Sequence, residues 1–143
     1  MTTYHASCSC GAVELEADGE PVVQCYCHCN SCRSFTGSPV NAPVLWPRDK
    51  VRFVKGEDKL LHYSKSGHAE AGRYSCGICY GIVGVYIFDA DLFDIFGGLV
   101  RDLTFTPTLH INYENSILPI KDGLPKFKDM PEEIGGSGAM MTE

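Results

Sequence analysis

The sequence predicts a mainly β protein, built from small antiparallel sheets and held together by metal-binding cysteines. First, short segments of alternating polarity, separated by turn residues, dominate the chain. Second, its eight cysteines fall into three close groups, and thiols two or three residues apart can converge on one tetrahedral ion. Third, 143 residues are enough for about one domain with a core of its own.

The expected strands begin at residues 12–17, where Val13, Leu15 and Ala17 alternate with Glu14 and Glu16. This period of two is the pattern of a half-buried strand. Similar signals predict strands at residues 22–27, 40–46, 51–54, 60–63, 82–88 and 109–113. Turn residues separate them at positions 19–21, 56–58 and 121–123.

Two later segments complete the predicted organisation. Residues 89–96 fit a short helix or a buried strand, and we favour a strand. The end of the chain is rich in Pro, Glu, Gly and Ser. We therefore expect one zinc-binding domain over residues 1–130, followed by a flexible tail over residues 131–143.

Composition and charge exclude several classes of partner. A net charge of −6 and a pI near 5.3 argue against a basic face that grips nucleic acid. No apolar stretch approaches the roughly 18 residues of a membrane span, and the N-terminal residues do not resemble a secretory leader. We expect a soluble, cytoplasmic protein whose cysteines stay reduced for metal, rather than a disulfide scaffold.

The middle cysteine group predicts a metal site with one open position. In a strand, residues i and i+2 share a face about 6.6 Å apart, whereas i and i+4 are about 13 Å apart. Cys27 and Cys29 can therefore share an ion, and Cys32 can join them if the chain bends after Cys29, but Cys25 cannot in an extended strand. His28 points to the opposite face, where we expect a hydrogen-bonding or packing role.

The other two groups predict a closed metal site. Cys8 and Cys10 form a Cys-x-Cys pair, and Cys76 and Cys79 form a Cys-x-x-Cys pair. Together they supply the four sulfurs of a structural zinc site, which should contribute to folding. Alternatives remain at this point: Cys25 could complete a second four-cysteine structural site, the ligands could hold an iron–sulfur cluster, or the last pair could be a redox motif.

Three motifs occur in order along the chain: Ser7-Cys8-Ser9-Cys10-Gly11-Ala12-Val13, then Cys27-His28-Cys29-Asn30-Ser31-Cys32-Arg33 with Thr36-Gly37-Ser38, then the pair Cys76 and Cys79. Over residues 4–127 the chain resembles the glutathione-dependent formaldehyde-activating family, whose domain is shared with centromere protein V. Tyr80 departs from the family pattern, which usually has glycine there.

The resemblance implies a fold, two metal ions and an activity. The fold would be Mss4-like, a tent of small β-sheets. Cys8, Cys10, Cys76 and Cys79 would bind a structural zinc, and Cys27, Cys29 and Cys32 a catalytic one, giving two Zn²⁺ per chain. The activity would be that of a carbon–sulfur lyase acting on S-(hydroxymethyl)glutathione, with glutathione as the thiol co-substrate and formaldehyde as the aldehyde.

Residue chemistry suggests one substrate contact and two other classes of function. Arg33 follows the last cysteine of the open site, where it can bind a carboxylate of glutathione. The alternatives are a non-catalytic zinc module that binds a protein or thiol partner, and a thiol-responsive metal sensor in which Cys25 is the resolving thiol. The sequence does not predict the oligomeric state.

Overall fold

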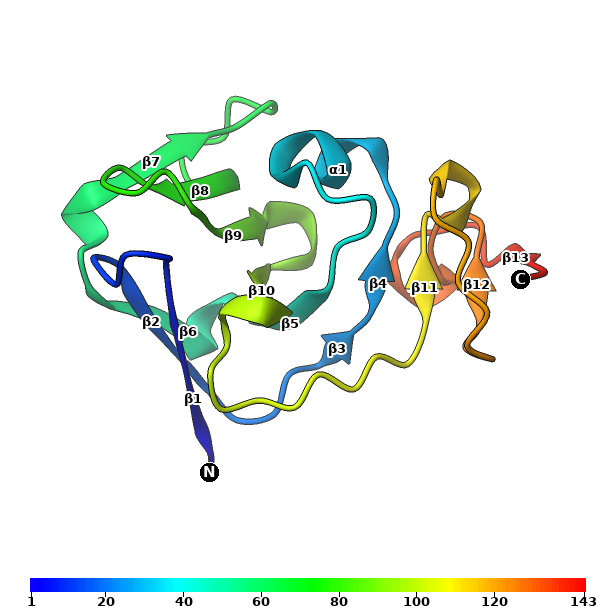
Figure 1. The fold of residues 1–143 in the computed structure, drawn as a ribbon, viewed down its shortest axis with the longest axis horizontal. Coiled ribbons are helices and arrows are strands. Elements are labelled where there is room, and N and C mark those ends of the chain that lie inside the picture. The colour runs from blue at the N-terminus through cyan, green and yellow to red at the C-terminus, as the bar shows by residue number, and fades with distance from the viewer. The chain divides into compact units, whose positions relative to one another are not determined.

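The structure of the protein, a computed structural model, describes residues 1–143. Contacts divide the chain into two compact units, of which the first comprises Met1–Val22 and Val44–Thr104 and the second Val23–Pro43 and Phe105–Glu143. The first is built mainly from strands, and the second combines short strands with irregular segments and one helix; the mainly β structure of the chain confirms the predicted fold class (Figure 1). None of the helices has the length and apolar character that crossing a bilayer requires.

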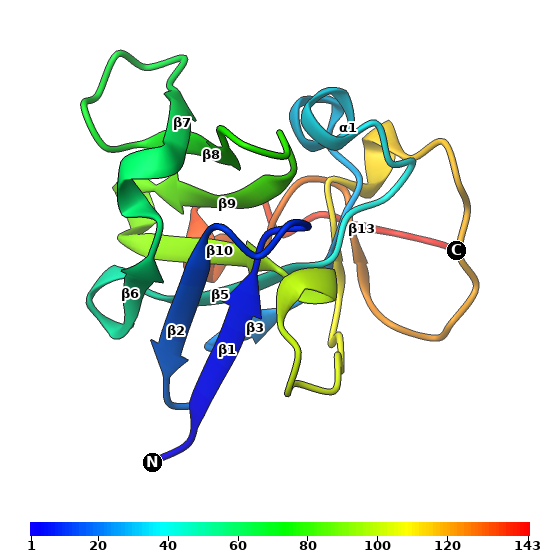
Figure 2. The same cartoon turned by 60° about the vertical axis from the view of Figure 1, so that its left-hand side comes forward.

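The first unit contains two sheets. The smaller is antiparallel and has the order β1-β2-β6, formed by β1 (Thr3–Ser7), β2 (Glu14–Asp18) and β6 (Val51–Lys55). Figure 2 shows β1 and β2 side by side. The strands that this unit contributes to the larger sheet have the order β5-β10-β9-β8-β7. They are β5 (Pro43–Pro47), β10 (Leu92–Phe96), β9 (Ile82–Ile87), β8 (Gly72–Cys76) and β7 (Leu60–Tyr63).

An apolar core fills the first unit, as the alternation in the sequence predicts. Leu15 and Ala17 of β2 are buried, whereas the neighbouring glutamates are partly exposed. Trp46, Phe93 and Ile95 are fully buried and are among the largest side chains of the core. The segment that fits either a helix or a strand is the strand β10, which follows a short 3-10 turn and pairs antiparallel with β9.

One carboxylate lies inside this core. Asp94 of β10 is 4% exposed, and its Oδ1 accepts a hydrogen bond from the Val44 amide at 3.2 Å. Burial raises the pKa of Asp94 to about 7, although the Val44 amide and Arg73 act in the opposite direction. A carboxyl group in this position favours the neutral form.

Asp94→Asn is therefore expected to stabilise the protein above pH 7. Because the pKa of Asp94 is higher in the folded than in the unfolded state, its stabilising contribution is present below about pH 4 and is lost as the pH rises through about 7. The free energy of unfolding of the variant should exceed that of wild type by about 2 to 4 kcal/mol at pH 8, with almost no difference at about pH 3. Urea unfolding at both pH values measures this, and equal differences would contradict it.

The second unit contains a small mixed sheet of order β13-β12-β11-β4. Its strands are β4 (Tyr26–Cys27), β11 (His110–Ile111), β12 (Lys126–Phe127) and β13 (Met140–Met141). β11 runs parallel to both β4 and β12, a pairing that the sequence does not predict. Parallel neighbours need a long connection, and here most of the first unit separates β4 from β11 in the chain.

The second unit also holds β3 (Val23–Gln24) and the only α-helix, α1 (Asn30–Thr36). Gly37 ends the helix in a left-handed conformation at φ 77°, and its amide bonds the Arg33 carbonyl at 2.7 Å. Residues 131–143, for which we predict a flexible tail, include β13, which pairs antiparallel with β12. The whole chain contains six short 3-10 segments, four in the first unit and two in the second. They are η1 (Arg48–Lys50), η2 (Glu57–Lys59), η3 (Phe88–Ala90), η4 (Gly97–Leu99), η5 (Tyr113–Asn115) and η6 (Glu132–Ile134).

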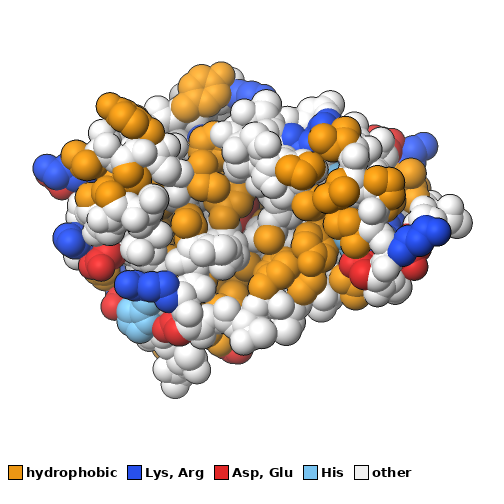
Figure 3. All heavy atoms as spheres, in the orientation of Figure 1, with side chains coloured by type: hydrophobic (Ala, Val, Ile, Leu, Met, Phe, Trp, Pro, Cys, Tyr) orange, Lys and Arg blue, Asp and Glu red, His pale blue; other side chains and the backbone are white.

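The interior of the second unit is unusually polar. Its buried side chains include His28, Asn41, His110 and Lys126, beside few apolar ones. Several of its apolar side chains instead reach the surface, Ile117 at 62% exposure among them, and Figure 3 shows such atoms in orange. Since hydrophobic burial is sparse here, hydrogen bonds and ion pairs must hold much of this unit together.

Candidate metal centres

Four cysteines of the first unit converge from two separate turns. Cys8 and Cys10 lie between β1 and β2, Cys76 ends β8, and Cys79 lies in the turn before β9. Their four sulfurs all lie within 4.8 Å of one another. The Sγ atoms of Cys8 and Cys10 are 3.8 Å apart, and those of Cys10 and Cys76 are 3.9 Å apart. A zinc ion with bonds of about 2.3 Å needs sulfurs about 3.8 Å apart, so this cluster can hold one.

Backbone amides surround the sulfurs of this first cluster. The Val13 amide donates to the Cys8 Sγ and the Ile78 amide to the Cys76 Sγ, each at 3.3 Å. The backbone amides of Gly81 and Cys10 lower the pKa of Cys79 to about 6. Amide donors favour the thiolate form, which is the form that binds a metal.

Three cysteines of the second unit form the other cluster. Cys27 ends β4, Cys29 is the N-cap of α1, and Cys32 lies in its first turn. Their sulfurs lie within 4.8 Å of one another, with 3.8 Å between those of Cys27 and Cys32. The bend that we predict after Cys29 is the start of a helix, in which the Cys32 amide donates to the Cys29 Sγ at 3.2 Å.

The second cluster has three sulfurs and can hold a cation. Hydrogen bonding with the neighbouring thiols of Cys29 and Cys32, together with burial, raises the pKa of Cys27 strongly. Several thiolates can coexist at this spacing only if a positive charge lies among them. Cys25 is buried but lies outside this group of sulfurs, so three protein thiolates would leave one position of a tetrahedral ion open.

A cavity of about 450 Å³ lies beside α1 in the second unit. It is lined by Asn30, Arg33, Ser34, Gly37, Ser38, Pro39 and Ile117. The Arg33 Nη2 donates to the Asn30 side-chain oxygen, while the Nε of Arg33 has no hydrogen-bond partner. This cavity therefore offers the guanidinium of Arg33 and the hydroxyl of Ser34 on the helix that carries Cys32, and the hydroxyl of Ser38 just after it, a suitable setting for a carboxylate.

The structure places two residues near the second cluster that the sequence does not single out, because neither belongs to a recognisable motif. Asn112, in a left-handed conformation after β11, directs its Nδ2 to the Cys27 Sγ at 3.7 Å. His110 of β11 is fully buried, and its Nδ1 lies 2.9 Å from the Nε2 of His28. Only the parallel pairing of β4 with β11 brings both residues to the cluster, and that pairing depends on the tertiary fold.

The chain is similar to known proteins both in sequence and in fold. The chain matches the model of the family described as glutathione-dependent formaldehyde-activating enzyme over residues 3–114. A search of curated proteins found no significant match. The crystal structure of a Rhodobacter sphaeroides protein, from a structural-genomics programme, is similar with a TM-score of 0.57 and 20% identity, covering 70% of this chain and 90% of that one.

The solved structure supports the fold alone, because its sequence identity is low. The family match extends across all three cysteine motifs and most of the chain. The protein therefore belongs to the glutathione-dependent formaldehyde-activating enzyme family.

Proposed function

We propose that the protein is a zinc-dependent carbon–sulfur lyase that forms or breaks S-(hydroxymethyl)glutathione. The observation that carries this proposal is the difference between the clusters: four sulfurs in the first, three in the second. Cys8, Cys10, Cys76 and Cys79 would hold a structural zinc. Cys27, Cys29 and Cys32 would hold a second zinc with one position left for a ligand. We place this reaction in the cytoplasm, where thiols stay reduced.

The charge of the second cluster favours a thiol over water as that ligand. Three thiolates outweigh a divalent ion and leave a net negative site, which acidifies water less than a histidine-bound zinc does. When bound there, zinc lowers the pKa of a thiol that occupies its fourth position and keeps the sulfur nucleophilic. The three cysteines thus fix where the thiol of the substrate lies.

Residues of α1 and of the loop after it would orient the rest of the thiol substrate. Arg33, Ser34 and Ser38 line the cavity and can bind a carboxylate of glutathione. In the forward direction the glutathione sulfur forms a bond to the carbon of formaldehyde while the carbon–oxygen π bond breaks. The oxygen takes up the proton that the thiol has lost, so atoms and charge balance without another reactant. The reverse reaction releases the aldehyde.

Thiol binding at the second cluster tests this proposal directly. Adding glutathione to protein loaded with zinc should raise the number of sulfurs around the second ion from three to four, as measured by X-ray absorption. Arg33→Met should weaken glutathione binding about tenfold, the usual loss for a hydrogen bond to a charged group, and should leave binding of the uncharged 2-mercaptoethanol unchanged. Zinc coordination that does not respond to any thiol would contradict the proposal and favour a non-catalytic zinc module.

A further inference from the structure

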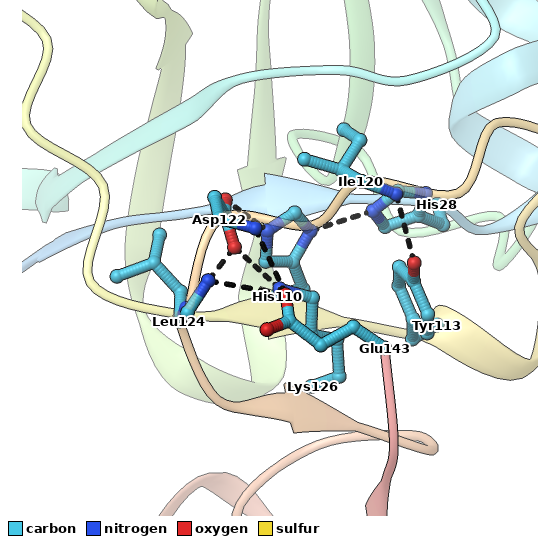
Figure 4. Close-up of polar contacts among 9 residues, drawn as sticks. His28, His110, Tyr113, Ile120, Asp122, Leu124, Lys126 and Glu143 are labelled. Carbon is cyan, nitrogen blue, oxygen red and sulfur yellow. Dashed lines mark hydrogen bonds and ion pairs between the residues drawn. The ribbon is translucent and has the colours of Figure 1, made fainter.

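A chain of hydrogen bonds runs from two buried histidines next to the second cluster to a partly exposed carboxylate (Figure 4). The Nε2 of His28 lies 2.9 Å from the Nδ1 of His110, and the Nε2 of His110 lies 2.8 Å from the Oδ2 of Asp122. Both imidazoles are fully buried, and their stacked rings are 5.1 Å apart. These hydrogen bonds thus link His28, which lies between Cys27 and Cys29, to the loop that carries Asp122.

Charged groups fix the far end of this chain. The Oδ1 of Asp122 accepts hydrogen bonds from the Nζ of Lys126 and from the Leu124 amide, the latter at 3.0 Å. Lys126 is 1% exposed, and its Nζ also lies 2.6 Å from the Oε2 of Glu143. Burial acts against ionisation of Asp122, but hydrogen bonds from Lys126 and His110 outweigh it and hold the pKa of this carboxyl below its usual range. Asp122 is therefore an anion that is held in one position.

An ionised Asp122 fixes the orientation of the His110 ring. Its Oδ2 can only accept, so the Nε2 of His110 donates to it. The other ring nitrogen of His110, Nδ1, then faces the Nε2 of His28, and the hydrogen bond between these two nitrogens fixes the second ring. The carboxylate thus sets the orientation of two successive rings.

His28 transmits this orientation to the sulfurs because of where it lies. Side chains alternate between the two faces of an extended segment, so anchoring the middle residue fixes the backbone that directs both neighbours to the other face. The His28 amide is also fixed, since it donates to the Ile111 carbonyl at 3.1 Å. Cys27 and Cys29 are the two neighbours.

We propose that Asp122, His110 and His28 form a positioning chain that holds the Cys27 and Cys29 sulfurs at metal-binding separation and so sets the metal affinity of the second cluster. This inference rests on the proposed function only in requiring that Cys27, Cys29 and Cys32 bind a metal. None of the three members would touch the ion or the substrate. Outer residues of this kind typically change metal affinity 10- to 100-fold when they are removed.

Cobalt binding measured by chelator competition tests the positioning chain without any assay of turnover. His110→Phe keeps the ring stacking and the Asp122–Lys126 pair but removes both hydrogen bonds of the imidazole. We expect the affinity of the second cluster for cobalt to fall about 10- to 100-fold, its visible spectrum to change, and the affinity of the first cluster to stay within about twofold. Asp94→Asn, which alters a buried carboxyl of the first unit, should change neither affinity.

If His110→Phe does not fold, the double variant Asp122→Asn/Lys126→Met tests the positioning chain in its place. It removes both charges of the Asp122–Lys126 pair together, so that Lys126 does not leave an unpaired charge in the interior, and it should show the same selective loss. Wild-type affinity at the second cluster in a folded variant, or an equal loss at both clusters, would overturn the inference. A wild-type protein that binds cobalt only at the first cluster would instead contradict the proposed second metal centre.

Discussion

Replacing Cys76 by serine is expected to remove one metal ion per chain and to unfold much of the first unit. Cys76 is fully buried, and its sulfur lies 3.9 Å from that of Cys10, 66 residues away in the chain. A metal at this cluster therefore closes a long loop and joins the end of β8 to the turn between β1 and β2. Structural zinc sites in small peptides are worth roughly 10 to 16 kcal/mol in apparent terms. The apolar core of this unit should retain part of that stability, so we expect a loss of several kcal/mol.

Urea unfolding and a count of metal per chain measure this effect. Cys25→Ser is the matched control, because Cys25 is equally buried but lies outside both groups of sulfurs. It should retain about two ions per chain and lose about 1 to 3 kcal/mol, the usual cost of burying a hydroxyl group. If Cys76→Ser keeps both ions and is no less stable than this control, the first cluster has no structural role.

The strands and the cysteine groups could be predicted because local chemistry determines both. Alternation of Leu15 and Ala17 with glutamates encodes β2 without reference to the rest of the chain. Cysteines two or three residues apart can reach one ion from a single turn, so spacing brings out each local group. The structure then places the pair Cys8 and Cys10 beside the pair Cys76 and Cys79. Cys25 also lies outside the second set, as an extended strand predicts.

The helix α1 and the positioning chain of Asp122, His110 and His28 could not be predicted in the same way. α1 is seven residues long with no buried side chain, so no apolar period marks it. In retrospect its two ends carry signals, a cap at Cys29 and a left-handed glycine at Gly37. His110, Asp122 and Lys126 come together only through the parallel strands of the second unit, and parallel pairing across a long connection leaves no local pattern.

Replacing Cys27 by serine is expected to abolish turnover of S-(hydroxymethyl)glutathione with a much smaller effect on stability than Cys76→Ser. Serine is a poor ligand for zinc, so the second cluster would keep two sulfurs and lose its ion. Without the ion the substrate thiol keeps its ordinary pKa, and the loss of several kcal/mol of transition-state stabilisation corresponds to about a thousandfold in rate or more. The second unit keeps the buried contacts of His110 and Lys126, which do not involve the cluster.

Exchange NMR of glutathione and formaldehyde measures the rate of adduct formation above the spontaneous background. Cys25→Ser is again the matched control, and it should keep nearly all of the enzyme-dependent rate together with both ions. If Cys25→Ser abolishes turnover while metal content is unchanged, Cys25 takes part as a thiol and the alternative of a thiol-responsive metal sensor gains support. If Cys27→Ser and Cys76→Ser destabilise the protein equally, both ions are structural, and the three-sulfur cluster does not distinguish a catalytic centre. Selective loss of rate in Cys27→Ser, with the first ion retained, is the outcome that an open metal position requires.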